Sequence, residues 1–156
     1  MLSPFCFADC RLLSSVTFEQ GSRLQTIGSH AFSECISLQS IVIPKSVEDL
    51  GESCFFQCRL SSVSFEQGSC LQTIGSHAFS ECISLRSIVI PKGVEELGEG
   101  CFVLCSALTS VTFERGSRLR RLPQGTFANC SQQLQVILHP DGKSLSLQQL
   151  AQGWQR

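Results

Sequence analysis

Hydrophobic positions recur along this chain in a fixed order. Short segments alternate a polar residue, most often serine, with a branched or aromatic apolar residue, which is the pattern of a half-buried β-strand. In the first segment the alternation places Val16 and Phe18 inside and Thr17 outside. Segments of this kind begin at Ser15, Ser40, Ser62, Ser87, Ser110 and Gln135. They predict six strands, separated by steps of 22 to 25 residues.

The residues after each predicted strand also repeat. An apolar pair three residues apart comes first, followed by phenylalanine, then cysteine and then leucine. The phenylalanine column consists of Phe7, Phe32, Phe55, Phe79, Phe102 and Phe127. The cysteine column consists of Cys10, Cys35, Cys58, Cys82, Cys105 and Cys130. A unit of this length cannot bury these side chains alone, so successive units are expected to stack with like residues above one another. The pattern predicts an α/β repeat solenoid with six parallel strands and little helix.

A longer period of 47 residues includes two of these units. Residues 15–40 and 62–87 differ at only three positions, and both contain the stretch GSHAFSECISL. Two turn types alternate after the strands. Pro44 and Pro91 directly follow their strands, where a missing N–H is tolerated. The other turn type contains glycine, at Gly21, Gly68 and Gly116.

The two ends of the chain depart from the repeat. Residues 1–138 form the predicted solenoid of about six repeats, and the first repeat is truncated. Because the chain starts partway through a unit, a longer array is left open. Residues 139–156 contain the turn signal HPDGK, then apolar residues at helical spacing. This spacing predicts a C-terminal capping helix on the last repeat, with its apolar face formed by Leu147, Leu150, Ala151 and Trp154.

Composition and charge argue against several classes of partner. The formal net charge is −1, with 12 basic and 13 acidic residues spread along the chain, so no electrostatic surface for nucleic acid is predicted. The apolar runs are too short for membrane insertion. The first residues, MLSPFCFADCRLL, do not have the basic and apolar regions of a secretory signal.

The repeat resembles a known family. The stretch LQTIGSHAFSECISLQSIVIPKSVEDLG is close to an ideal copy of the BspA-type leucine-rich repeat, and the resemblance extends over about Leu2 to Leu138. The spacing departs from the pattern where Leu60 follows Cys58 after two residues and Leu134 follows Cys130 after four. The resemblance implies a curved, right-handed solenoid with the strands on its concave side. It also implies an adhesin-like, protein-binding role at a cell surface or after secretion, while the sequence itself assigns no compartment.

The ten cysteines allow three interpretations: a metal site, disulfides or packed thiols. Cys54 and Cys58 have C-x-x-x-C spacing, but the first cysteine alternates with Ala31 and Ala78, which predicts a niche for a small side chain rather than a zinc ligand. Side chains stacked in register stay about 4.8 Å apart, whereas the Cβ atoms of a disulfide prefer about 3.8 Å. We therefore predict packed free thiols, with Cys70 in an exposed turn.

The histidines do not form a predicted catalytic site. His30 and His77 share a column with phenylalanine, serine and glycine, so the fold does not require an imidazole there. They lie two units apart, about 10 Å by strand spacing, which is too far to share a proton or a metal. Exposed ion pairs are expected between acids and arginines at the apolar pairs, namely Glu48, Asp49, Glu95 and Glu96 with Arg120 and Arg121.

A binding surface is expected from the outward strand positions, on the concave face of the solenoid. Hydroxyl-bearing strands alternate with apolar ones, and acidic residues lie at the edge, which suits a protein or peptide ligand. The candidate partner-binding residues are Thr17, Glu19, Val42, Ser64, Glu66, Val89, Thr112, Glu114 and Ile137. The sequence thus predicts a non-enzymatic protein-interaction module with no catalytic residue, cofactor or metal. Two alternatives stay open: a structural spacer with no specific ligand, and a redox or metal protein that uses the cysteines.

Overall fold

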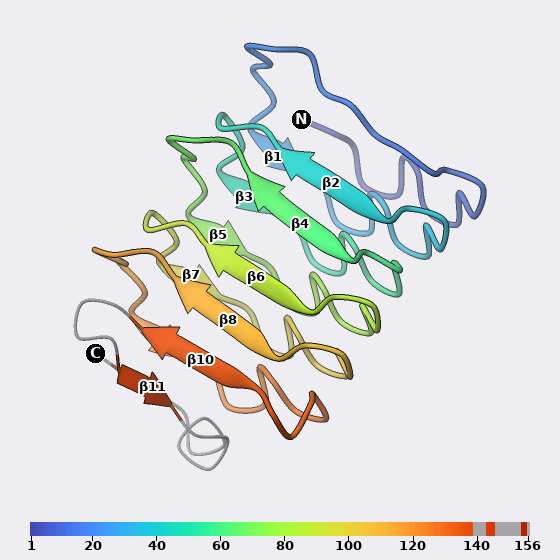
Figure 1. Ribbon diagram of the computed structural model, residues 1–156. Coiled ribbons are helices and arrows are strands. Elements are labelled where there is room, and N and C mark those ends of the chain that lie inside the picture. Colours follow the sequence, from blue (N-terminus) through green and yellow to red (C-terminus); the bar gives the residue numbers. More distant parts are fainter. Residues whose placement is uncertain (139–142, 146–153, 156) are drawn as a thin grey trace.

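The computed structural model describes residues 1–138, 143–145 and 154–155, and the chain winds into a solenoid of stacked turns (Figure 1). The described residues contain no helix. One face carries a row of longer strands, the long-strand ladder: β2 (Ser40–Ile43), β4 (Ser62–Phe65), β6 (Ser87–Ile90), β8 (Ser110–Phe113) and β10 (Gln135–Leu138). Another side carries two-residue strands, the short-strand ladder: β1 (Thr26–Ile27), β3 (Asp49–Leu50), β5 (Thr73–Ile74), β7 (Glu96–Leu97) and β9 (Arg121–Leu122).

The long-strand ladder confirms five of the six predicted strands. β2 pairs with β4, and β6 with β8 and then β10, always parallel and with matching residues opposite each other. The strand predicted at residues 15–18 is wrong, because this segment forms no ladder with β2. Val16 and Phe18 nevertheless pack against the core, as the alternation predicts. The short-strand ladder was not predicted.

The interior consists of columns of like side chains. The six phenylalanine rings of neighbouring turns stack with centroids 5.3 to 5.6 Å apart and planes within 12° of parallel. The four middle rings have no exposed surface, and the leucine, cysteine and paired apolar columns join the same core. The predicted stacking of identical positions is therefore confirmed.

Glycine allows successive turns to approach closely at the end of the first four short strands, β1, β3, β5 and β7. A Cβ on Gly51 would lie 2.5 Å from the backbone nitrogen of Ser29, and a Cβ on Gly75 would lie 2.7 Å from the carbonyl carbon of Gly51. The N–H groups of both glycines donate to carbonyls of the preceding turn, at 2.8 Å. In the last turn Pro123 takes this position, lacks the N–H and adds a Cβ. β7 and β9 accordingly form no ladder.

Proline also opens the long-strand ladder. Where strands pair, the residue after one strand donates its N–H to the last carbonyl of the preceding strand, as Glu66 does to Ile43 at 3.0 Å. Pro91 stands at this position after β6 and has no N–H, and β4 and β6 form no ladder. Residues 15–18 meet Pro44 in the same way, which gives the physical reason for the missing first strand. β10, which His139 follows in the sequence, does pair with β8.

Two short strands border the last turn. β11 (Lys143–Leu145) pairs antiparallel with β10, and β12 (Trp154–Gln155) pairs antiparallel with β9. The predicted capping helix falls mainly on residues 146–153, which lie outside the described residues. At its end, Trp154 is in a strand instead of the predicted helix, because it pairs with Leu122.

The stacked rings make the middle of the solenoid sensitive to loss of one ring. We expect Phe79→Ala to lower the free energy of unfolding by about 3 to 5 kcal/mol, since it removes a fully buried ring between two others. Phe5→Ala is the control, because Phe5 is 61% exposed, and should cost about 1 kcal/mol or less. Urea denaturation followed by circular dichroism measures both, and equal losses would contradict the role of the column.

Candidate functional site

Seven of the nine candidate partner-binding residues lie on the outer face of the long-strand ladder or in the turns beside it, and Thr17 and Glu19 lie before it, in and after the segment 15–18 that forms no ladder. The apolar members of the two SIVI strands are the most prominent, with Val42 54% and Val89 51% exposed. In the paired strands Val42 lies opposite Ser64, and Val89 lies opposite Thr112. Apolar and hydroxyl side chains therefore alternate between adjacent strands. Ile137, in β10, is half-buried.

Two of the candidate acids have a structural use. The Glu66 carboxylate accepts the backbone N–H of Lys45 at 2.9 Å, and the Glu114 carboxylate accepts that of Lys92 at 3.0 Å. Each carboxylate thus holds the turn that follows Pro44 or Pro91 in the preceding unit. Both carboxylates therefore help to fix the backbone of these turns. Glu19 occupies the same position in the sequence and is exposed.

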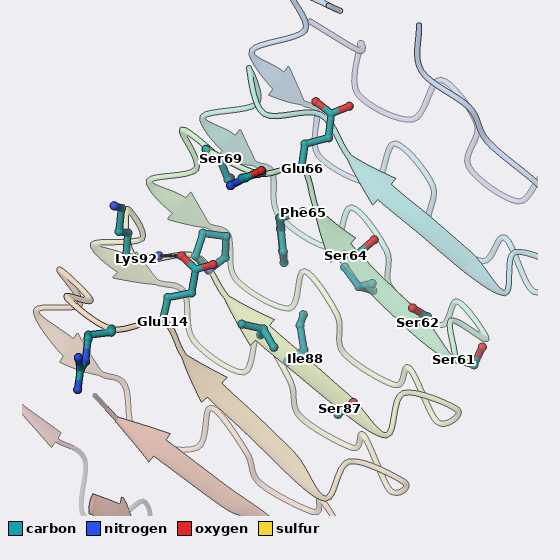
Figure 2. A pocket seen from close by; sticks show the side chains of 16 residues that line it. Ser61, Ser62, Ser64, Phe65, Glu66, Ser69, Ser87, Ile88, Lys92 and Glu114 are labelled. Atoms are coloured by element: carbon teal, nitrogen blue, oxygen red, sulfur yellow. Dashed lines mark hydrogen bonds between the residues drawn. The ribbon is translucent and has the colours of Figure 1, made fainter. Parts of the chain in front are cut away.

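The structure brings four of the nine residues together around a groove of about 760 Å³ between β4 and β6 (Figure 2). These four are Ser64, Glu66, Val89 and Glu114. Ser61, Ser62 and Ser87 lie at one end of the groove, and Glu66, Ser69, Lys92 and Glu114 lie toward the other. Thr17, Glu19, Val42, Thr112 and Ile137 lie outside it. The groove lies where β4 and β6 form no ladder, and Pro91 is part of its lining.

Phe65 belongs to this groove and was missed by the sequence analysis. Its position alternates inward, and at the equivalent position Phe113, in β8, which is paired on both sides, is fully buried. Phe65 is only half-buried and lines the groove together with the buried Ile88. Opening the ladder therefore exposes part of an aromatic ring on this face. The sequence feature that could have predicted this exposure is Pro91, which directly follows β6 and lacks the N–H that would pair with β4.

The column cysteines are packed thiols that donate to the backbone. The Sγ atoms of Cys58 and Cys105 lie 3.0 Å from the carbonyl oxygens of Phe32 and Phe79 in the preceding unit, and the rest of the column from Cys35 onward repeats this contact. All ten cysteines are free. Burial raises the pKa of the Cys35 thiol to about 11 and that of Cys58 to about 12. These thiols therefore stay protonated and act as structural donors near neutral pH.

The other cysteines fit their predicted places. Cys54 and Cys101 are fully buried at the position that Ala31 and Ala78 hold in other units, which confirms the niche for a small side chain. Cys70 is exposed, as predicted. Among the residues that the structure describes, no three side chains of histidine, cysteine, aspartate or glutamate gather as they would around a metal ion.

The histidine column is explained by backbone conformation. His30 and His77 both have φ of 55°, and Ser53 and Gly100 at the same position in other units also have positive φ. The His30 ring stacks on Phe5 with centroids 4.7 Å apart. The units therefore share a left-handed backbone conformation at this position. The side chain itself varies among histidine, serine and glycine, so the fold does not require an imidazole there.

One of the expected ion pairs is present where the short-strand ladder is interrupted, between β7 and β9. Arg120 pairs with Glu95 across the gap between β7 and β9, where a groove of about 530 Å³ also includes Glu96 and Arg121. The arginine side chain is 68% exposed, so this pair contributes little stability.

The parallel strands and the stacked leucine, phenylalanine and cysteine columns define a leucine-rich-repeat solenoid. Residues 1–134 match the model of the BspA type leucine rich repeat region in six copies, and the chain belongs to this family. A comparison with curated proteins found no match.

Three solved structures share the fold. The pneumococcal vaccine antigen PcpA is 33% identical, with a TM-score of 0.64 and coverage of 67% of this chain and 26% of that protein. A leucine rich repeat protein of T. pallidum is 30% identical, with a TM-score of 0.67 and coverage of 77% and 55%. A leucine rich cell surface protein from Faecalibacterium prausnitzii is 29% identical, with a TM-score of 0.69 and coverage of 85% and 33%. This chain therefore spans between 26% and 55% of their lengths.

In the part of the chain that the structure describes, no helix has the length and apolarity needed to cross a bilayer.

The buried thiols predict a specific loss of stability at high pH. The folded-state pKa of Cys58 lies above its ordinary value of 9.0, so an unfolded chain releases this proton first. The free energy of unfolding should therefore be unaffected below pH 9 and fall as the pH rises toward 12, by about 1.4 kcal/mol per pH unit for each such thiol. Cys58→Ala should make this slope shallower, and Cys70→Ala, in an exposed turn, is the comparison variant. Denaturation series from pH 8 to about 11 compare the slopes, and identical slopes in all three proteins would refute the assignment.

Proposed function

We propose that this chain is a non-enzymatic, adhesin-like module that binds a protein or peptide ligand through the outer face of its long-strand ladder. The observation that carries the proposal is the groove between β4 and β6, where the exposed Val89 and the half-buried Phe65 lie beside serine hydroxyls. An apolar centre with a polar border is the usual composition of a protein-binding patch. The rigid stack of turns beneath it keeps the patch in shape without a ligand.

The nine residues have distinct roles in this proposal. Val42 and Val89 supply apolar area, and because each is about half exposed, covering the rest of one side chain contributes about 1 kcal/mol. The hydroxyls of Thr17, Ser64 and Thr112, which lie between the apolar strands, would form hydrogen bonds with the ligand. Ile137 extends the apolar surface to the last strand, and the acids Glu19, Glu66 and Glu114 border the face.

The relatives support a place for this module at a cell surface. One of the similar structures is described as a cell surface protein, and another as a vaccine antigen. Since this chain spans only part of their lengths, the ligand face described here is proposed as one segment of a larger binding surface. Several weak contacts along such an array would add to one another.

The test is selection of peptides from a random phage-displayed library on the immobilised protein. We expect enriched peptides whose binding weakens at least about tenfold with Val89→Lys, because the lysine charges the centre of the apolar patch. The matched control is Ile83→Lys, in the same unit, because Ile83 is 50% exposed and does not line the groove. Enrichment that is equally sensitive to both variants, or no enrichment, would favour the spacer alternative.

A further inference from the structure

We infer that the ligand of the outer face is an amphipathic α-helix that lies along the solenoid axis and places two apolar side chains, seven residues apart, on two equivalent sites. This inference rests on the proposed function and narrows it to one class of polypeptide ligand. It follows from the spacing of like residues along the face, whereas the proposal above follows from a single groove.

The outer face carries one arrangement of side chains twice. In each copy a half-buried phenylalanine precedes an exposed valine in the next strand, and a proline follows that strand, so the two segments form no ladder. The exposed fractions of the two valines agree, at 54% and 51%. The first site consists of Phe18, Val42 and Pro44, and the second site, which lines the groove, consists of Phe65, Val89 and Pro91.

The third copy of the arrangement is closed. Here β8 and β10 are paired, Phe113 is fully buried and Ile137 is half-buried. His139 follows β10 in the place where the other two copies have proline. The described part of the face therefore offers two such apolar sites.

The two sites lie two turns of the solenoid apart. Val42 lies opposite Ser64 in the paired strands β2 and β4, and Val89 occupies the same position in β6, the next long strand. At the ordinary distance between neighbouring strands, two turns correspond to about 10 Å. A ligand that fills both sites must therefore present two apolar side chains about 10 Å apart on one side.

This spacing favours a helical ligand over an extended one. In an α-helix, residues i and i+7 are about 10.5 Å apart along the axis and lie on the same face. In an extended segment, the side chains of one face are about 6.6 Å apart at i+2 and about 13.2 Å apart at i+4, and neither distance fits. The helix needs no space between the strands, because it lies over the face and directs one side chain to each site.

The edge of the face carries charges that alternate in sign from turn to turn. The Glu66 carboxylate accepts the backbone N–H of Lys45, and the Glu114 carboxylate accepts that of Lys92, so residues of opposite charge lie on adjacent turns. A carboxylate that accepts one N–H keeps further acceptor capacity. Among the described residues, none of these charged side chains forms an ion pair. In the order of the turns, the charged residues are Glu19, Lys45, Glu66, Lys92 and Glu114.

One edge of a helix can complement this row of charges. Helix residues three or four apart are separated by about 5 to 6 Å, close to the distance of about 4.8 Å between neighbouring strands. Lysine and glutamate at alternate helical turns would therefore face glutamate and lysine along the edge of the solenoid. Such exposed pairs add little affinity, but they set the register and orientation of the helix.

The test uses alanine-rich peptides three heptads long, acetylated and amidated, whose binding is measured by fluorescence anisotropy. The first peptide has leucine at i and i+7, with lysine and glutamate alternating along one edge. The second has the same composition, but its leucines are at i and i+4, about 6 Å apart on the same face. We expect the first to bind at least about tenfold more tightly, because only it reaches both sites.

Two further peptides test the helix and its charged edge. Proline midway between the leucines breaks the helix and should lower binding to the level of the second peptide. Exchanging all lysines and glutamates keeps the composition and reverses the charge pattern. This exchange should weaken binding at low salt and have no effect in about 1 M salt, where exposed charges are screened.

Variants of the protein test whether the two sites act as a pair. Val42→Lys and Val89→Lys should each weaken binding of the first peptide at least about fivefold. Each should also remove its advantage over the second peptide, because one remaining site cannot distinguish the two spacings. Ile83→Lys is the matched control and should change neither result, since Ile83 is exposed outside the groove. The comparison of peptides on the unchanged protein does not depend on the folding of any variant.

The inference is overturned if the first peptide does not bind, if the first and second peptides bind equally, or if the proline copy binds as well as the first. It is also overturned if only one of the two valine variants weakens binding. Library peptides that depend on Val89 but not on Val42 would leave the proposed function standing and reject the helical ligand. Absence of any library peptide that depends on Val89 would reject the proposed function itself.

Discussion

The close approach of successive turns is the constraint on which the rest of the structure depends. Each turn must place a backbone donor against the turn before it, at a spacing that lets the phenylalanine rings stack 5.3 to 5.6 Å apart. Glycine allows this contact at one corner, because a Cβ on Gly51 would lie 2.5 Å from the neighbouring backbone. At another corner, buried thiols hold successive turns together by donating to carbonyls of the preceding unit. Duplicated residues such as His30 and His77 share a left-handed backbone conformation with Ser53 and Gly100 at the same position of other units.

The same constraint explains why proline has such a local effect. Pro91 opens the long-strand ladder between β4 and β6, while the short strands β5 and β7 of the same turns stay paired. Pro123 opens the short-strand ladder between β7 and β9, while β6 and β8 stay paired. Each opening is thus spanned by an intact ladder on another side of the solenoid. A groove with open strand edges can form in this way without dividing the core.

Features that follow from the repeat period could be predicted from the sequence. Features that depend on whether one particular residue has a backbone N–H were missed. The columns, the exposed Cys70 and the inward direction of Phe18 follow from period and alternation, and the structure confirms them. The absent strand at residues 15–18 and the half-buried Phe65 depend on whether residue 44 or 91 carries an N–H. Alternation alone treats Phe65 and Phe113 alike, although β4 is paired on one side only and β8 is paired on both sides. The outward positions could be named from the sequence, but their convergence on one groove required the strand pairing.

Hydrogen exchange of individual backbone amides tests the central claim most directly, because it reports which strand edges lack ladder bonds. The account predicts that the amides of Val63, Phe65, Ser87 and Val89 exchange much faster than those of Ile88 and Val111, although all six residues lie in adjacent strands of one face. Uniform protection from β2 through β10 would show that the ladder is continuous past Pro91. That result would contradict both the open edge and the groove that depends on it.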